Sequence, residues 1–308
     1  MPEPVSLTGR RLTTIFDRLL DHYGPQDWWP GDSDLEIIVG AILTQSAAWR
    51  NVEKAINALK IRGLLEIDAL RSIDQGKLAQ LIRPSGYFNA KAAKIKAFIA
   101  MLDEHYNGRL GMLLSEPLDA MRDRLLATPG IGSETADAIV LYAGGLPTFV
   151  VDAYARRILR RIGFGPAEDG YEDWRAFLME ALPPDAALFN EYHALLVAHG
   201  KALCGKHRIR CEACPLLDLC ATGQDSVTSS QSSGRTGIVQ PSGGRQSRQA
   251  GSKSGSPARA ASTARSPSAR NSPSRLAGNM PRRIASPSSS SSFQRKVDRS
   301  ADSSTSSS

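Results

Sequence analysis

The chain has 308 residues, of which 41% are hydrophobic, and a formal net charge of +7. A chain of this size can bury one sizeable or two modest cores, and the lack of an apolar run of about 20 residues excludes a membrane span. From Ala221 onward, 13 Lys and Arg face 3 Asp and Glu, a charge of +10, so subtraction leaves 25 against 28, or −3, for residues 1–220. The excess of positive charge therefore lies at the C-terminal end.

Residues 1–220 have helical periodicity. The first 23 residues carry an apolar stripe typical of an amphipathic helix that belongs to the fold, and not of a signal peptide. Ser33 and Glu36 have capping-box spacing, and the stripe after them predicts a helix running toward Gln45. Further apolar stripes lie at 52–59, 93–102, 136–143, 158–162, 174–182 and 189–196. No long run alternates polar and apolar residues, so the predicted fold is all-α.

A tight reversal is predicted between two of these helices. One helix ends near Thr128, the segment Pro129-Gly130-Ile131-Gly132 turns the chain, and a new helix begins near Ser133. Gly130 and Gly132 suit positive φ angles or close approach. Backbone N–H groups at the helix start can bind a phosphate oxygen. The alternative is a plain connector between helices.

Four cysteines, the only ones in the chain, close the predicted folded part with the spacing C-x6-C-x2-C-x5-C: Cys204, Cys211, Cys214 and Cys220. Such a set can hold an iron–sulfur cluster or zinc. Zinc sites favour two C-x2–4-C pairs, and this segment has one. Disulfides are disfavoured because C-x2-C is too tight for two unstrained bridges and no secretory segment precedes them. The spacing favours iron–sulfur.

The tail, residues 221–308, is rich in Ser, Arg, Gly, Pro and Ala and poor in aromatic and branched apolar residues. Such a composition buries too little surface to offset the entropy of ordering, so we predict a disordered basic tail. Its spread arginines favour salt-sensitive, nonspecific contacts with nucleic acid. The alternative is an inert solubilising tail.

The motifs Leu43-Thr44-Gln45-Ser46, Pro129-Gly130-Ile131-Gly132, Val151-Asp152 and the cysteine spacing follow one another in the chain. In this order they resemble the endonuclease III superfamily of DNA base-excision glycosylases. These are helix-hairpin-helix proteins with an essential aspartate and, in many members, a four-Cys [4Fe–4S] loop. The resemblance runs from about residue 10 to Cys220.

The resemblance implies two helical lobes with DNA bound across the cleft between them. One lobe is 34–147, with the helix-hairpin-helix motif at 118–145. The other combines 1–33 with 148–220 and holds the cluster. The implied partner is double-stranded DNA with a damaged or mismatched base, which is flipped into the cleft of a monomer. Gln45 matches the family residue that fills the vacated stack.

Asp152 matches the essential aspartate of the family. Breaking an N-glycosidic bond builds positive charge on the sugar, which a carboxylate can stabilise while it positions the attacking water. Asp152 is also well placed as a helix N-cap, and the two roles are compatible.

Glu134 stands where bifunctional members have the lysine that forms a Schiff base. A carboxylate cannot form an imine, so Glu134 favours a monofunctional glycosylase that leaves an abasic site. A first-turn helix charge is the alternative role of Glu134, and another lysine could supply weak lyase activity.

Trp28, Trp29 and Pro30 precede the first helix of the 34–147 lobe, and Trp49 follows Gln45 by one turn. In the inferred fold these tryptophans cluster at one cleft, where their faces would attract a positively charged alkylated purine. Such a leaving group needs no general acid. Trp28-Trp29-Pro30 and the stretch from Gly130 to Asp137, Gly-Ile-Gly-x-Glu-Thr-Ala-Asp, also look like the 3-methyladenine DNA glycosylase III branch. The alternative role of the tryptophans is core packing.

Three functional hypotheses result from these residues. The first is a glycosylase for alkylated purines such as 3-methyladenine. The second is a glycosylase for uracil or thymine mismatches, or for oxidised pyrimidines with lyase activity. The third is a noncatalytic helix-hairpin-helix DNA-binding protein.

Lys206, Arg208 and Arg210 lie between the first two cysteines. As in the family's cluster loop, they would contact phosphates beside the lesion. The alternative is a solvated run of charge. Nothing in the sequence addresses the protein to another compartment, so we expect it in the cytoplasm, at the nucleoid, or in the nucleus if the organism is eukaryotic.

Overall fold

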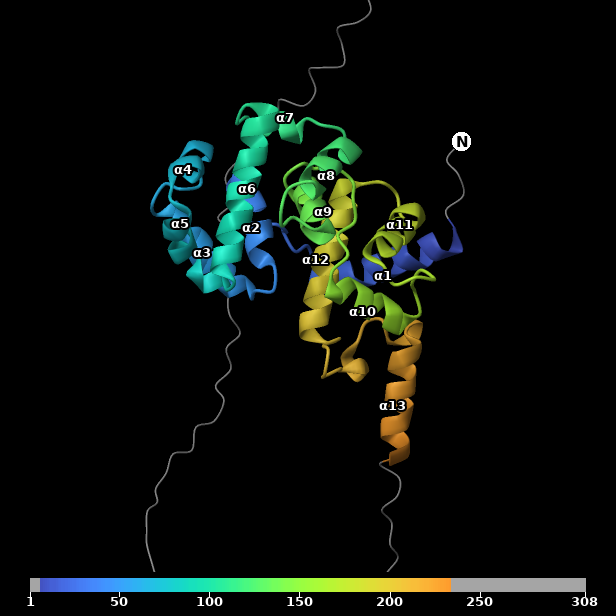
Figure 1. Cartoon of the computed structure of the whole chain (residues 1–308). Coiled ribbons are helices and arrows are strands. Elements are labelled where there is room, and N and C mark those ends of the chain that lie inside the picture. The colour runs from blue at the N-terminus through green and yellow to red at the C-terminus, as the bar shows by residue number, and fades with distance from the viewer. Residues whose placement is uncertain (1–5, 234–308) are drawn as a thin grey trace, which may run out of the picture. The chain divides into compact units, whose positions relative to one another are not determined.

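The computed structural model describes residues 6–233, and the regular elements within that range are helices (Figure 1). An isolated β-bridge between Cys204 and Ile209 is the sole β-pairing in this range. The predicted all-α fold is therefore confirmed. None of the helices described is long and apolar enough to cross a membrane.

One group of helices combines the start of the described chain with its last third. Its members are α1 (Leu7–Tyr23), α10 (Ala153–Ile162), α11 (Tyr171–Ala181) and α12 (Ala186–Ala202). The apolar stripe of α1 packs against α11 and α12, and α12 also packs against α10 (Figure 1). The buried Tyr192 hydroxyl donates to the Leu12 carbonyl at 2.9 Å, which fixes α12 on α1.

The helices of the other group follow one another along the chain. They are α2 (Asp34–Thr44), α3 (Trp49–Lys60), α4 (Ile67–Ser72), α5 (Gln75–Leu81), η1 (Arg83–Ser85), α6 (Phe88–Tyr106), α7 (Leu110–Leu114), α8 (Leu118–Leu126) and α9 (Ser133–Tyr142). The long helix α6 packs against α2, α4, α5 and α7, while α9 packs against α2 and α8. Ser33 caps α2 as the spacing predicts, because its hydroxyl accepts the Glu36 N–H at 3.3 Å. Helix α9 also contacts α11 and α12, so it joins the two groups.

A buried lysine fixes the end of α2. The fully buried Lys91 donates from Nζ to the Leu43 carbonyl at 2.8 Å and to the Ser85 carbonyl at 2.7 Å. Desolvation, together with the nearby Lys94, lowers the Lys91 pKa to about 8. These bonds satisfy a carbonyl at the C-terminal end of α2, where the helix has no partner of its own. The segment that follows, which includes Gln45, is thereby held against α6.

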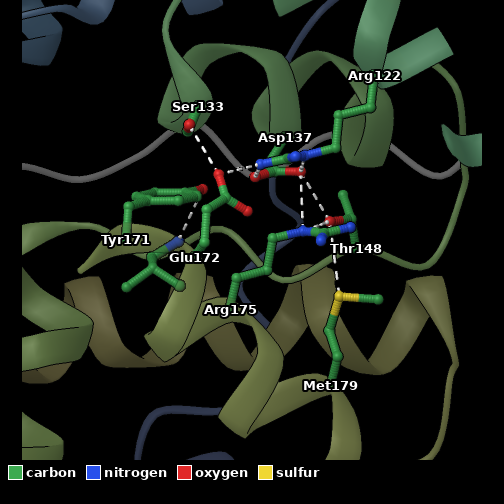
Figure 2. Close-up of polar contacts among 9 residues, drawn as sticks. Arg122, Ser133, Asp137, Thr148, Tyr171, Glu172, Arg175 and Met179 are labelled. Carbon is green, nitrogen blue, oxygen red and sulfur yellow. Dashed lines mark hydrogen bonds and ion pairs between the residues drawn. The ribbon is translucent and has the colours of Figure 1, made fainter. Parts of the chain in front are cut away.

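A buried ionic cluster joins the α8–α9 hairpin to α11 (Figure 2). Asp137 has no exposed surface and accepts from Arg122 Nε at 2.9 Å and from Thr148 Oγ1 at 2.8 Å. Arg175 Nε lies 3.2 Å from the same carboxylate. Glu172 completes the cluster by pairing with Arg122 Nη2 at 2.6 Å. Two cations and a hydroxyl thus compensate one buried charge, which is the condition for burying it.

The same cluster reaches the start of α9 and the segment before α10. Ser133, the first residue of α9, donates from Oγ to Glu172 at 2.9 Å. The Tyr171 hydroxyl accepts the Val151 N–H at 3.4 Å, one residue before Asp152. Figure 2 shows these contacts around one centre. The hairpin and the Asp152 segment therefore share a common support on α11.

The cysteine segment contains the short helices η2 (Cys211–Ala213) and η3 (Leu217–Leu219), followed by α13 (Ala221–Ser233). The sequence predicted disorder from residue 221, and this boundary is wrong by the length of α13. The first turn of α13 is fixed because Gln224 donates to the Leu217 and Asp218 carbonyls at 3.3 and 2.8 Å. Residues 234–308, the rest of the predicted tail, lie outside the described residues.

Candidate active site and cysteine loop

A pocket of about 520 Å³ opens where the two groups of helices meet at α9. Its walls come from the loop after α1, the end of α2, the start of α3, α9, the start of α10, and α12. Six of the residues singled out in the sequence line it: Trp28, Trp29, Gln45, Trp49, Glu134 and Asp152.

Asp152 is the N-cap of α10. Its Oδ1 accepts the Ala155 N–H at 2.8 Å, and its Oδ2 lies 3.5 Å from His193 Nε2. Burial, which leaves 15% of the side chain exposed, would by itself raise the Asp152 pKa. His193 and the backbone N–H groups of Ala155 and Tyr154 outweigh burial and lower that pKa below its usual value. Asp152 is therefore an ionised, partly exposed carboxylate in the wall of the pocket.

His193 and Tyr142 were not recognised from the sequence, yet both line this pocket. His193 Nδ1 lies 2.6 Å from the Tyr142 hydroxyl, and both side chains are buried. His193, Val197 and Lys201 are four residues apart, so they form one stripe of α12 along the pocket. The periodicity of α12 predicted the helix, but Tyr142, the partner of His193, is 51 residues away in the chain.

Glu134 lies in the first turn of α9 and is exposed. The surrounding protein desolvates the carboxylate, and the charge of Asp152 adds to this effect, so the Glu134 pKa is raised. His193 and Arg156 oppose the rise. Glu134 and Asp152 are thus electrostatically coupled carboxylates of one pocket.

Four aromatic rings line the pocket next to one another. Trp29 is central: its ring centroid lies 5.3 Å from that of Trp28, 5.2 Å from that of Trp49 and 5.2 Å from that of Tyr142. Trp29 lies directly over Gly40 of α2, where a Cβ atom would come within 3.2 Å of the indole. The missing side chain at Gly40 therefore lets the ring approach the helix. Trp28, Trp29 and Trp49 are half-buried and retain surface in the pocket.

Gln45 is held by two side chains. Its Nε2 donates to Thr135 Oγ1 at 2.7 Å, and its Oε1 accepts from Lys94 Nζ. Lys94 also lies beneath the hairpin, because a Cβ on Gly130 would come within 2.6 Å of the Lys94 Cγ. Gly130 has a φ of +86°, which favours glycine independently of space.

The hairpin presents its backbone outward. Gly130 and Gly132 are exposed, Gly132 is the N-cap of α9, and α9 has no side-chain cap. The N–H groups of the first turn of α9 therefore lack the side-chain acceptor that Asp152 supplies to α10.

The remaining predicted contact residues lie elsewhere. Pro30 is exposed and does not line the pocket, and the exposed Lys206, Arg208 and Arg210 belong to the cysteine segment.

The four cysteines line a second, separate pocket, and all four are free thiols. Its other walls are largely apolar and include Ile158, Leu203 and Leu216. Arg161 Nη1 donates to Cys204 Sγ at 3.1 Å and to the Gly205 carbonyl at 2.8 Å. Gly223 N–H donates to Cys220 Sγ at 3.3 Å. Within residues 6–233 no three Cys, His, Asp or Glu side chains form a group that could hold a single metal ion.

Comparison with known proteins agrees with this architecture. Residues 39–184 match the model of the HhH-GPD superfamily of base excision DNA repair proteins. A "Putative DNA repair glycosylase" of Methanocaldococcus jannaschii is 41% identical over 207 residues, which cover 67% of this chain and 94% of that protein. The chain therefore belongs to the HhH-GPD superfamily, as a base excision repair DNA glycosylase, and the predicted resemblance to endonuclease III is confirmed.

Solved structures show the same relationship. An endonuclease III in a non-covalent complex with DNA is 25% identical, with a TM-score of 0.61, and the match covers 72% of this chain and 100% of that one. A 3-methyladenine DNA glycosylase of H. pylori bound to 1,N6-ethenoadenine is 26% identical, with a TM-score of 0.55. That match covers 63% of this chain and 97% of the other.

Proposed function

We propose that this protein is a monofunctional DNA N-glycosylase that hydrolyses the bond between a damaged base and its sugar and leaves an abasic site. The observation that carries the proposal is the ionised Asp152 carboxylate in the wall of a pocket that aromatic rings also line. A negative charge and a base-sized apolar surface in one cavity fit a flipped nucleotide.

Asp152 would act on the sugar. As the C1′–N bond breaks, its electron pair goes to the base and positive charge develops on the sugar, which the carboxylate stabilises. Water then forms the new C1′–O bond and gives up a proton to Asp152 or to solvent. Glu134 has no amine for an imine, so the step ends with an intact strand.

The aromatic rings favour alkylated purines such as 3-methyladenine. Such a base carries a formal positive charge. Stacking it on an indole face is more favourable than stacking the uncharged normal base by about 0.5–2 kcal/mol. The charge also makes the base a good leaving group, which departs without first taking a proton from an acid. The likeness to a 3-methyladenine DNA glycosylase supports this choice.

The cysteine pocket fits a [4Fe–4S] cluster. Four free thiols surround one apolar space, and Arg161 and the Gly223 N–H donate hydrogen bonds to two of the sulfurs. Cys204, Cys211, Cys214 and Cys220 would be the ligands, and the bound cluster would supply a rigid staple. Lys206, Arg208 and Arg210 would then contact phosphates beside the lesion, and Gly130 and Gly132 would bind a phosphate through backbone N–H groups.

The cluster is tested by the composition of purified protein. We expect a brown protein with iron and sulfide in proportion to the chain. Colourless protein with stoichiometric zinc, or with thiols paired as disulfides, would contradict the assignment.

We expect a monomer that acts on chromosomal DNA, at the nucleoid or, in a eukaryote, in the nucleus.

Base release tests the function directly. Duplexes each carry one lesion: a 3- or 7-methylpurine, uracil or thymine opposite guanine, or an oxidised pyrimidine. We expect strand breaks only after alkali, and fastest release from an alkylated purine. A faster mismatch substrate would replace the proposed substrate class, and no release from any duplex would leave the noncatalytic DNA-binding alternative.

Asp152→Asn is the matched variant. The amide keeps an oxygen for the Ala155 N–H but removes the charge, so we expect at least about a hundredfold slower release with duplex binding retained. The variant should unfold at the same temperature as the wild type. Unchanged release would exclude the proposed role of Asp152.

Strand cleavage is a second candidate activity because Lys201 lies among the residues that line the pocket. If strand breaks occur without alkali, borohydride should trap the wild-type protein on DNA, and Lys201→Gln should not be trapped.

A further inference from the structure

A buried imidazole nitrogen faces Asp152 without a hydrogen bond of its own. The His193 side chain is 7% exposed, and its Nε2 has no hydrogen-bond partner among the described residues. That nitrogen lies 3.5 Å from Asp152 Oδ2. An unsatisfied buried polar atom is costly, so its place beside a functional carboxylate requires an explanation.

The two oxygens of Asp152 have different surroundings. Oδ1 accepts the Ala155 N–H at 2.8 Å and is fixed by the start of α10. Oδ2 is the oxygen that faces His193. The orientation of the carboxylate about its Cβ–Cγ bond therefore depends on what His193 presents to Oδ2.

The chemistry of the partners sets the direction of the hydrogen bonds. An ionised carboxylate accepts only, so the nitrogen that faces it is favoured to carry a proton. In a neutral imidazole, protonated Nε2 leaves Nδ1 as an acceptor. Nδ1 lies 2.6 Å from the Tyr142 hydroxyl, which can donate to it. The order is then Tyr142 O–H to Nδ1, and Nε2–H to Asp152.

We propose that Tyr142 and His193 are positioning residues that hold Asp152 ionised and orient Oδ2 toward the sugar of the flipped nucleotide. This inference rests on the proposed glycosylase function. Neither side chain needs to touch the base. Tyr142 fixes the tautomer of His193, and His193 fixes the carboxylate.

Other charged groups lie in or beside the same pocket. They are Glu134 from α9, Arg156 from α10 and Lys201 from α12. Burial raises the pKa of Tyr142 well above its usual value, so the phenol keeps its proton and remains a donor. Both the neutral and the protonated imidazole can donate from Nε2 to Asp152, but in the protonated ring Nδ1 also carries a proton, so it then donates to the Tyr142 oxygen.

The consequence is a shift in the acid limit of catalysis. Burial would raise the Asp152 pKa, and His193 opposes this rise more strongly than any other group. Without His193 the folded-state pKa of Asp152 rises, so the carboxylate is lost at a higher pH. Activity that requires the carboxylate should then fall off about one pH unit or more earlier on acidification.

The test is the single-turnover rate of base release by the full chain between about pH 3 and 8, less the release without protein, on the best duplex from the lesion panel. His193→Leu keeps an apolar volume without a donor, and we expect an acid limb shifted upward with a lower plateau. His193→Gln keeps an N–H, so it should recover most of the plateau. Tyr142→Phe keeps the ring against Trp29 but frees the tautomer, so its rate should fall about tenfold with unchanged duplex affinity.

Tyr192→Phe is the control, because Tyr192 is a buried tyrosine that donates to the Leu12 carbonyl, away from the pocket. It should keep the wild-type pH profile. If His193→Leu and Tyr142→Phe also keep that profile while Asp152→Asn is inactive, the positioning role is wrong and the glycosylase stands. If the wild type releases no base, both proposals fail together.

Discussion

Asp152 serves as a helix cap and as the candidate catalytic carboxylate because its two oxygens face different partners. Oδ1 satisfies the Ala155 N–H, which would otherwise be unpaired at the start of α10. Oδ2 stays at the pocket wall beside His193. The cap thus fixes the backbone under the residue that would react, and rigid support of this kind favours accurate positioning of the carboxylate.

Glu134 offers a gain-of-function test at the same scale. Glu134→Lys would put an amine in the first turn of α9, beside the carboxylate of Asp152. We expect strand breaks without alkali and a borohydride-trapped adduct, because the amine can attack C1′. The measurement is denaturing electrophoresis of protein and DNA after reduction. Glu134→Gln, which has no amine, is the matched control and should give no adduct.

The sequence indicated part of this site. Trp28, Trp29 and Trp49 were expected at one cleft from the resemblance, and their rings are in contact. His193 was missed because a histidine on an apolar helix has no local signature. Its contact with Tyr142 exists only once α9 and α12 are packed.

At the scale of elements, the cluster around Asp137 links the α8–α9 hairpin, the Thr148 segment and α11 (Figure 2). Helices α9 and α11 were predicted from their apolar stripes, and α8 from the helix end expected near Thr128. The cluster was not, because Arg122, Asp137 and Arg175 each read as ordinary helix charges until the fold brings them together. The short helices α4, α5 and α7 were not singled out either, because their apolar stripes are too brief.

Asp137→Ala should destabilise the protein strongly. It would leave two partly buried arginines without their shared carboxylate, and breaking a buried pair in this way costs about 3–5 kcal/mol. Urea unfolding followed by circular dichroism measures the change. Asp103→Ala is the control. Asp103 lies on α6 and forms an exposed ion pair with Arg71 of α4. The unfolding midpoint of the control should not move measurably, and an equal effect of both variants would contradict the assignment.

At the scale of the whole molecule, residues 1–220 and the tail, residues 221–308, differ in charge. Residues 1–220 carry −3, and the chain from Ala221 carries +10. DNA attraction that is independent of sequence would therefore come largely from the tail. The helical start of this segment, α13, was not predicted because its stability depends on contacts with Cys220 and Leu217 and not on its own composition.

Ending the chain at Ser233 tests the tail. We expect weaker duplex binding at low salt and a shallower fall of log K with log salt, by roughly 0.9 for each phosphate that the shortened chain no longer neutralises. Titration at several salt concentrations gives this slope. Base release at saturating protein should be unchanged. Equal slopes for both chains would favour the inert solubilising role.

If Gln45 fills the vacated stack, as the resemblance implies, its two hydrogen bonds set a threshold for opening DNA. The side chain would then have to leave Thr135 and Lys94. A neutral hydrogen bond contributes about 1 kcal/mol and one to a charged group about 1.5–3 kcal/mol, so withdrawal carries a real penalty. On undamaged DNA, Gln45 would therefore keep its bonds to Thr135 and Lys94. A base pair weakened by damage costs less to open, so Gln45 would enter the stack there. Lys94 also lies under Gly130, so one lysine contacts both the hairpin and the side chain that would fill the stack. The search for a lesion and the extrusion of its base would then be separate steps, and the loss of the Lys94–Gln45 hydrogen bond would mark the passage from one to the other.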